Sequence, residues 1–145
     1  MDVREIMRVL PHRHPILMVD RIVEIERGQR AVGIKNVTIS EPVFMGHYPD
    51  VPILPGVYIL EAMAQVAGVC FMPEETQGLD GQAPVPLFTG VDKARFRRPV
   101  APGDQLRIEV RALRVRGAMA KIAAEATVDG QTVAEAELMF AWGRV

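Results

Sequence analysis

The pattern of apolar positions predicts one long, deeply buried helix. Residues 57–71 contain no proline and are apolar at most positions, and Glu61 and Gln65 are their main polar interruptions. A helix that is apolar on nearly all sides must be covered on most of them. A segment of about 15 residues spans roughly 22 Å as a helix. We therefore expect this helix at the centre of the fold.

Six further segments show the apolar and polar alternation that is typical of strands. They are residues 18–26, 31–37, 87–96, 105–116, 119–128 and 132–142. In the first segment, Val19, Val23 and Ile25 are expected to share one face. In the fourth, the apolar phase shifts by one residue at Leu113, which predicts a β-bulge. Residues 128–131 read Val-Asp-Gly-Gln, which is typical of a tight hairpin turn.

The remaining segments complete a single-domain plan. Residues 2–9 predict a short helix in which Asp2 and Glu5 have capping-box spacing, and residues 73–86 read as a surface loop. Strands that alternate bury only one face. The simplest arrangement is an α+β fold, an antiparallel six-stranded sheet curled around the central helix, formed by one domain of residues 1–145. A second subunit would cover any part of the helix that the sheet leaves bare, so we expect a homodimer.

Composition excludes several classes of function. The formal net charge is −1, so the chain is not expected to bind nucleic acid. The N-terminal residues do not have the pattern of a signal peptide, and the longest apolar run contains Glu61 and is too short to span a bilayer. The single cysteine, Cys70, excludes an internal disulfide and fits a reducing compartment. These features predict a cytoplasmic protein that does not act in a membrane.

The candidate chemistry lies where a stiff loop meets the central helix. His47 lies in the proline- and glycine-rich residues 46–56, just ahead of Glu61. Histidine is a natural general base, since its ordinary pKa of about 6.5 leaves much of it neutral at pH 7. An apolar surrounding favours the protonated form of a glutamate, which then acts as an acid. Each residue alone has a structural explanation, but together they favour catalysis.

The start of the helix is a candidate oxyanion site. Gly56 and Val57 are not preceded by a serine, threonine or aspartate cap, so their N–H groups are free to bind a developing negative charge. The alternative is that Gly56 is an ordinary N-cap. The residues themselves leave both possibilities open.

One dense basic cluster follows the predicted surface loop. It consists of Lys93, Arg95, Arg97 and Arg98. The first three share one face if residues 87–96 and their neighbours continue as a regular strand. The cluster is either a solvated face paired with carboxylates or a docking patch for an acidic partner. No metal site is expected, because His12, His14 and His47 are not accompanied by a clear set of further ligands.

Four segments together resemble one known family. They are GHYPDVPILPGVYILEAMAQ at residues 46–65, LPHRHPILMVDRI at 10–22, DKARFRRPVAPGDQL at 92–106 and VAEAELMFA at 133–141. Taken in their order along the chain, they resemble the β-hydroxyacyl-acyl-carrier-protein dehydratases of type II fatty acid synthesis, of the FabZ type. That family has the hotdog fold, a sheet wrapped around a helix. The resemblance therefore agrees with the fold argued from the apolar pattern.

The resemblance implies a reaction and a set of residues. The chain would eliminate water from a (3R)-hydroxyacyl thioester to give the trans-2-enoyl thioester, as a hydro-lyase without a cofactor. The substrate would be carried on the phosphopantetheine of acyl-carrier protein, for which the basic cluster would be the docking patch. His47 and Glu61 would be the catalytic pair and would meet across a dimer interface, while Gly56 would bind the thioester carbonyl and Gln65 would support the acid. Tyr48 departs from the phenylalanine that is usual in the family.

Other interpretations remain open at this stage. The same fold carries thioesterases and dehydratase-isomerases, although the isomerising relatives usually have aspartate where this chain has Glu61. A non-catalytic acyl-binding protein is a third alternative. The sequence does not decide between a dimer and a hexamer built as a trimer of dimers. Nor does it show which acyl chain length is preferred.

Overall fold

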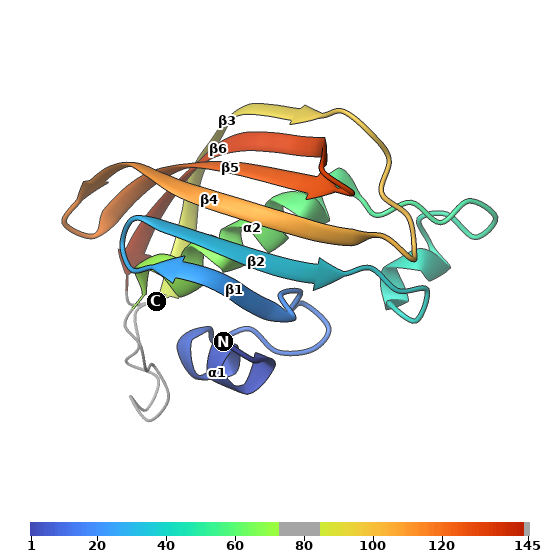
Figure 1. The fold of residues 1–145 in the computed structure, drawn as a ribbon, viewed down its shortest axis with the longest axis horizontal. Coiled ribbons are helices and arrows are strands. Elements are labelled where there is room, and N and C mark those ends of the chain that lie inside the picture. The colour runs from blue at the N-terminus through green and yellow to red at the C-terminus, as the bar shows by residue number, and fades with distance from the viewer. Residues whose placement is uncertain (73–84, 144–145) are drawn as a thin grey trace.

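The computed structural model describes residues 1–72 and 85–143, which form one curled sheet around a helix (Figure 1). The helical elements are α1 (Val3–Val9), the 3₁₀ helix η1 (Pro42–Met45) and α2 (Gly56–Phe71). The strands are β1 (Arg21–Glu26), β2 (Arg30–Asn36), β3 (Val85–Phe96), β4 (Gln105–Arg116), β5 (Met119–Val128) and β6 (Gln131–Gly143). All neighbours in the order β1-β2-β4-β5-β6-β3 are antiparallel. The predicted six-stranded α+β architecture is confirmed.

Helix α2 lies against the concave face of the sheet (Figure 1). Its small residues allow other elements to come close: a Cβ added to Gly68 would lie 2.8 Å from Cδ2 of Leu10. The largest buried side chains between helix and sheet include Met63, Val66, Leu106, Ile108, Ile122 and Leu138. Burial of such side chains contributes about 1.5–3 kcal/mol each, so this layer is the main source of stability. No helix in the described part of the chain is long and apolar enough to cross a membrane.

The N-terminal helix has the predicted cap. Asp2 Oδ1 accepts hydrogen bonds from the N–H groups of Arg4 and Glu5 at 2.8 and 3.0 Å. The Glu5 carboxylate in turn accepts from the Asp2 N–H at 2.6 Å. This reciprocal pair satisfies N–H groups that have no partner within the helix.

Two local predictions in the second half of the chain are confirmed. The register between β4 and β5 shifts between Ala112 and Arg114, where the apolar phase changes. Asp129 and Gly130 both have positive φ, 48° and 76°, as a type I′ hairpin turn requires. In both places the local sequence determines the backbone because few alternatives are compatible with it.

The first strand differs from the prediction. It begins at Arg21, and the residues before it form a loop. Val19 is buried, whereas Val23 and Ile25 are exposed, so the three do not share one face. The reason is a register shift between Ile22 and Glu24, which leaves Ile22 as the buried residue of this strand.

The predicted surface loop at residues 73–86 is partly wrong. Val85 and Pro86 belong to β3, which pairs with β6 as far as Gly143. Residues 73–84 lie outside the described residues. Strand β3 is an edge of the sheet and exposes Leu87, Phe88, Val91 and Phe96, each by 44 to 51%. An exposed apolar edge is a surface that another chain can pair with, and the homodimer remains a prediction.

Candidate active site

The ring of His47, the candidate base, is held by a backbone carbonyl. The residue follows η1 in the loop before α2, and its Nδ1 lies 2.6 Å from the carbonyl oxygen of Ile53. A carbonyl can only accept, so Nδ1 carries a proton, and in the neutral ring Nε2 has the free lone pair. A second hydrogen bond joins the same two residues, since the Ile53 N–H donates to the His47 carbonyl at 3.1 Å. The loop thus fixes both the tautomer and the direction of the ring.

The N-terminus of α2 supplies free N–H donors. Pro55 is the N-cap and makes no side-chain cap, and the first backbone bond of the turn runs from the Tyr58 N–H to the Pro55 carbonyl at 2.9 Å. The N–H groups of Gly56 and Val57 have no hydrogen-bond partner in the described chain. The helix dipole adds partial positive charge at this end. The alternative role of Gly56 as the N-cap is wrong, since Gly56 is the first helical residue.

Gly56 is also needed for close packing. A Cβ at this position would lie 2.8 Å from the ring of Phe96. His47, Gly56, Val57 and Phe96 line one open pocket of about 470 Å³. The rest of its wall comes from Ile53, Leu54, Ile59, Arg97, Arg98, Pro99 and Val100. The structure therefore brings the candidate base and the candidate oxyanion donors to the same pocket.

Glu61 lies one helical turn before Gln65, which is almost completely buried. Gln65 Nε2 donates to Glu61 Oε1 at 2.8 Å and to the Ile16 carbonyl at 2.7 Å. Gln65 Oε1 accepts from the Met18 N–H at 2.8 Å. The amide is thus fixed on three sides, and it holds the carboxylate in one orientation.

A residue that sequence reasoning set aside also reaches Glu61. His12 Nε2 lies 3.4 Å from Glu61 Oε1. The His12 imidazole is the largest influence on the carboxyl; with the Gln65 amide it outweighs burial and holds the Glu61 pKa below its ordinary value. The expectation that apolar surroundings keep Glu61 protonated is therefore wrong for the single chain. His12 lies in the LPHRHP segment, but no local pattern indicates that this loop folds over α2.

The single chain does not join the two candidate catalytic residues. Glu61 is not part of the pocket that His47 lines, and no hydrogen bond or ion pair joins their side chains in residues 1–72 and 85–143. His47 lies with the helix start, and Glu61 lies with His12 and Gln65. Each chain thus contains two separate halves of the predicted site.

Two of the four members of the basic cluster are paired with carboxylates. Lys93 Nζ lies 2.7 Å from Glu137, and Arg97 lies 2.5 Å from Glu135. The β3–β6 register shifts between Asp92 and Arg95, and Lys93 has a φ of 51°, so the regular alternation predicted for the cluster is interrupted by a bulge. These ion pairs agree with the interpretation of the cluster as a solvated face paired with carboxylates. However, two members of the cluster, Arg97 and Arg98, also line the pocket of His47.

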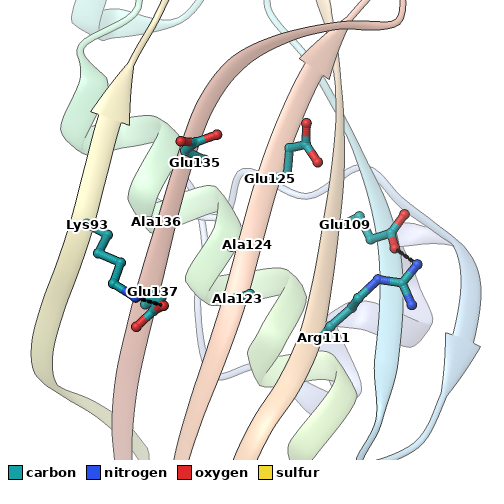
Figure 2. A pocket seen from close by; sticks show the side chains of 9 residues that line it. All are labelled: Lys93, Glu109, Arg111, Ala123, Ala124, Glu125, Glu135, Ala136 and Glu137. Atoms are coloured by element: carbon teal, nitrogen blue, oxygen red, sulfur yellow. Dashed lines mark hydrogen bonds and ion pairs between the residues drawn. The ribbon is translucent and has the colours of Figure 1, made fainter.

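A pocket of about 310 Å³ lies on the same sheet, and Figure 2 shows the residues that line it. Its lining combines Ala123, Ala124 and Ala136 with charged side chains from the neighbouring strands. These charges are arranged as local pairs, such as Lys93 with Glu137 and Arg111 with Glu109. Within the part of the chain that the structure describes, no three histidine, cysteine or acidic residues form a group that could hold a metal ion.

Comparison with known proteins identifies relatives over nearly the whole chain. A model of the FabA-like domain matches residues 10–137. A 3-hydroxyacyl-[acyl-carrier-protein] dehydratase FabZ from Anoxybacillus flavithermus is 51% identical over 99% of this chain and 98% of its own. The enzyme of the same name from Desulforamulus reducens is 52% identical over 99% of both chains.

Solved structures agree on the fold. The dehydratase heterocomplex ApeI:P from Xenorhabdus doucetiae matches with a TM-score of 0.75 at 17% identity, over 96% of this chain and 91% of its own. A virulence protein from Campylobacter jejuni matches with a TM-score of 0.71 at 21% identity, over 98% of both chains. At these identities the likeness shows the hotdog fold alone.

Proposed function

Because the chain belongs to the FabA-like family, we infer that it is a 3-hydroxyacyl-[acyl-carrier-protein] dehydratase, a hydro-lyase of fatty acid synthesis. The observation that carries this function is identity of about half over 99% of the chain to dehydratases of that name. A (3R)-hydroxyacyl thioester would lose water to give the trans-2-enoyl thioester. The substrate would arrive on the phosphopantetheine of acyl-carrier protein. The reaction changes no oxidation state overall, so it requires no redox cofactor.

The site geometry supports a division of roles. Nε2 of His47 would take the proton from C2, since its Nδ1 is already committed to the Ile53 carbonyl. The negative charge that develops on the thioester oxygen would be bound by the free N–H groups of Gly56 and Val57. Such preorganised donors typically lower a barrier by about 3–4 kcal/mol. As the C3–O bond breaks, its electron pair stays on the oxygen, which takes a proton from Glu61 and leaves as water.

The separation of the two halves supports a site built from two subunits. His47 of one subunit would face Glu61 of the other. This arrangement would explain why the two side chains are not joined within one chain. The exposed apolar edge of β3 is the surface on which we expect the second copy to pair. A homodimer is the smallest assembly with complete sites, and a trimer of dimers would contain the same pairs.

The lowered pKa of Glu61 fits this reaction because elimination and hydration are one reaction in two directions. The catalytic pair carries one proton between its two members. With the proton on Glu61 and neutral His47, the site removes water. With the proton on His47 and ionised Glu61, it adds water to the enoyl thioester. The contacts in the single chain favour the ionised form of Glu61, whereas elimination requires its protonated form.

The function is tested by incubating the protein with (3R)-hydroxyacyl-acyl-carrier proteins of several chain lengths. We expect time-dependent formation of the enoyl thioester, followed by mass spectrometry of the carrier protein. Release of the free carrier thiol without enoyl formation would contradict the proposal and indicate a thioesterase.

Gly56→Ala is expected to lower kcat/KM by up to about 10²-fold, because displacement of reacting groups by 1 Å has an effect of this size. The added methyl group would lie 2.8 Å from the Phe96 ring, so the helix start or the pocket wall must move. The matched control is Gly46→Ala, where the new Cβ is 4.0 Å from its nearest neighbour, the Val43 carbonyl oxygen. Steady-state kinetics of both variants test this, and equal activities would show that the close packing at Gly56 does not serve the site.

We propose that Arg97 and Arg98 guide acyl-carrier protein to the pocket that they line. Arg97→Glu removes a positive charge from the pocket and places a carboxylate near Glu135. We expect a higher KM for the carrier-protein substrate and an unchanged KM for a short pantetheine thioester. The matched control is Arg116→Glu. It makes the same charge change at the last residue of β4, which does not line the pocket of His47. Equal losses with both substrates would contradict docking at this cluster.

A further inference from the structure

His12 is placed against the candidate acid by a loop that is fixed at several points. This loop joins α1 to β1. Arg13 folds back and donates to the carbonyls of Leu10 and Met7 at 2.8 and 3.1 Å. Farther along, the loop backbone is bound by Gln65 through Ile16 and Met18. The His12 side chain is 22% exposed and is held between these anchors.

Two donors converge on one oxygen of Glu61. Gln65 Nε2 lies 2.8 Å from Oε1, and His12 Nε2 lies 3.4 Å from the same atom. The second distance is longer than an ordinary hydrogen bond, as is common for catalytic groups before substrate binds. No hydrogen bond or ion pair to Oε2 is present in the described residues. The carboxyl group is therefore held by one oxygen, and the other is left for a ligand.

The surroundings of the His12 ring indicate which of its nitrogens donates a hydrogen bond. Nδ1 is buried and has no hydrogen-bond partner in the described chain. A doubly protonated ring would bury an N–H group without an acceptor, which costs about 1–3 kcal/mol. A neutral ring needs only one donor, and the carboxylate oxygen beside Nε2 is the acceptor for it. The ring thus fits its site with the proton on Nε2.

We propose that His12 is a positioning residue for Glu61, which donates Nε2–H to Oε1 and, together with Gln65, directs Oε2 towards the substrate hydroxyl. The proposal rests on the dehydratase function above and deepens it. His12 does not touch the reacting atoms. Its role is to hold the carboxyl group in the one orientation from which a proton passes to the leaving oxygen.

The contact also predicts how Glu61 titrates. In the described residues, His12 is the titratable group that contacts Glu61, and the other contact, Gln65, is neutral. A donor to the ionised carboxylate lowers its pKa, so removal of that donor raises it. The Glu61 pKa is expected to set the acidic limb of the pH dependence of kcat. When His12 is replaced, the pKa rises and this limb should move to higher pH.

The test compares His12→Ala, His12→Gln and His14→Ala. Glutamine offers an N–H donor that does not titrate, and His14 is an exposed histidine of the same loop. For His12→Ala we expect kcat to fall by about 10- to 100-fold with little change in KM, since the acid is misplaced rather than absent. The low-pH limb should move upward, His12→Gln should recover most of kcat, and His14→Ala should match the wild type. A loss of kcat without recovery by glutamine and without a shifted limb would overturn the proposal, as would unchanged kinetics.

A second measurement does not depend on activity. The carboxyl carbon of Glu61 can be titrated by ¹³C NMR, with its signal assigned by its absence in Glu61→Gln. We expect a higher pKa in His12→Ala than in the wild type, and an equal pKa would overturn the proposal. If the wild type formed no enoyl product, the dehydratase function would fail while this titration still tested the contact.

Discussion

Replacing His47 by alanine is expected to lower the rate of dehydration by about 10²–10⁴-fold, the usual contribution of a general base. The variant lacks the lone pair that removes the C2 proton, and no other imidazole lines the pocket with the helix start. The Ile53 carbonyl loses only a side-chain donor, so the fold should be kept. The measurement is kcat for enoyl formation, with thermal unfolding to check the fold.

The matched control is Tyr48→Phe. Tyr48 is 53% exposed and stacks on the His47 ring at 4.1 Å, and the substitution keeps the ring while removing the hydroxyl. It should retain the wild-type rate. Near-normal activity of His47→Ala would show that another group is the base.

Glu61→Gln is the second variant expected to show a large loss. It keeps the size and the polar surroundings of the side chain but cannot transfer a proton, so kcat should again fall by about 10²–10⁴-fold. KM should change little, because the helix start and the pocket of His47 are untouched. Steady-state kinetics with the carrier-protein substrate measures both. Retained kcat would mean that the leaving oxygen is protonated by water or another residue.

The two inactive variants also test how the site is assembled. A mixed dimer of His47→Ala and Glu61→Gln subunits contains one intact pair and one doubly altered pair if the site spans the subunits. Because a two-fold dimer has two equivalent sites, such a dimer should have about half of the wild-type activity. Purification with two different affinity tags isolates it. An inactive mixed dimer would show that the catalytic groups come from the same chain.

Local signals were reliable where one backbone conformation was strongly preferred. Asp129 and Gly130 form the predicted turn because both must adopt positive φ. The bulge near Leu113 was visible because the apolar phase changes within one strand. In β1 the same kind of shift, between Ile22 and Glu24, was missed, because Val23 and Ile25 are apolar although they are exposed. Apolar residues at the edge of a sheet do not reveal which face they occupy.

The candidate site also has features that the local sequence predicts and features that it does not. His47, Gly56, Glu61 and Gln65 were predicted as candidates from a short segment, because an unusual loop and a polar interruption of an apolar helix are visible locally. The protonation of Glu61 was not predicted correctly, since it depends on groups that are far apart in the sequence. The Glu61 pKa is lowered by His12, which lies 49 positions earlier in the printed sequence.

By itself the sequence determined most of the helices and strands, the hotdog architecture and the candidate residues for catalysis. Periodicity and turn residues can be read from neighbouring positions, and the resemblance can be read from short segments. Tertiary structure decided which of those residues meet. It placed His47 with the N-terminus of α2 and Glu61 with His12, and it left the two halves apart within one chain. The physical reason is that a carboxylate responds to the donors and the burial around it, which only the folded chain brings together.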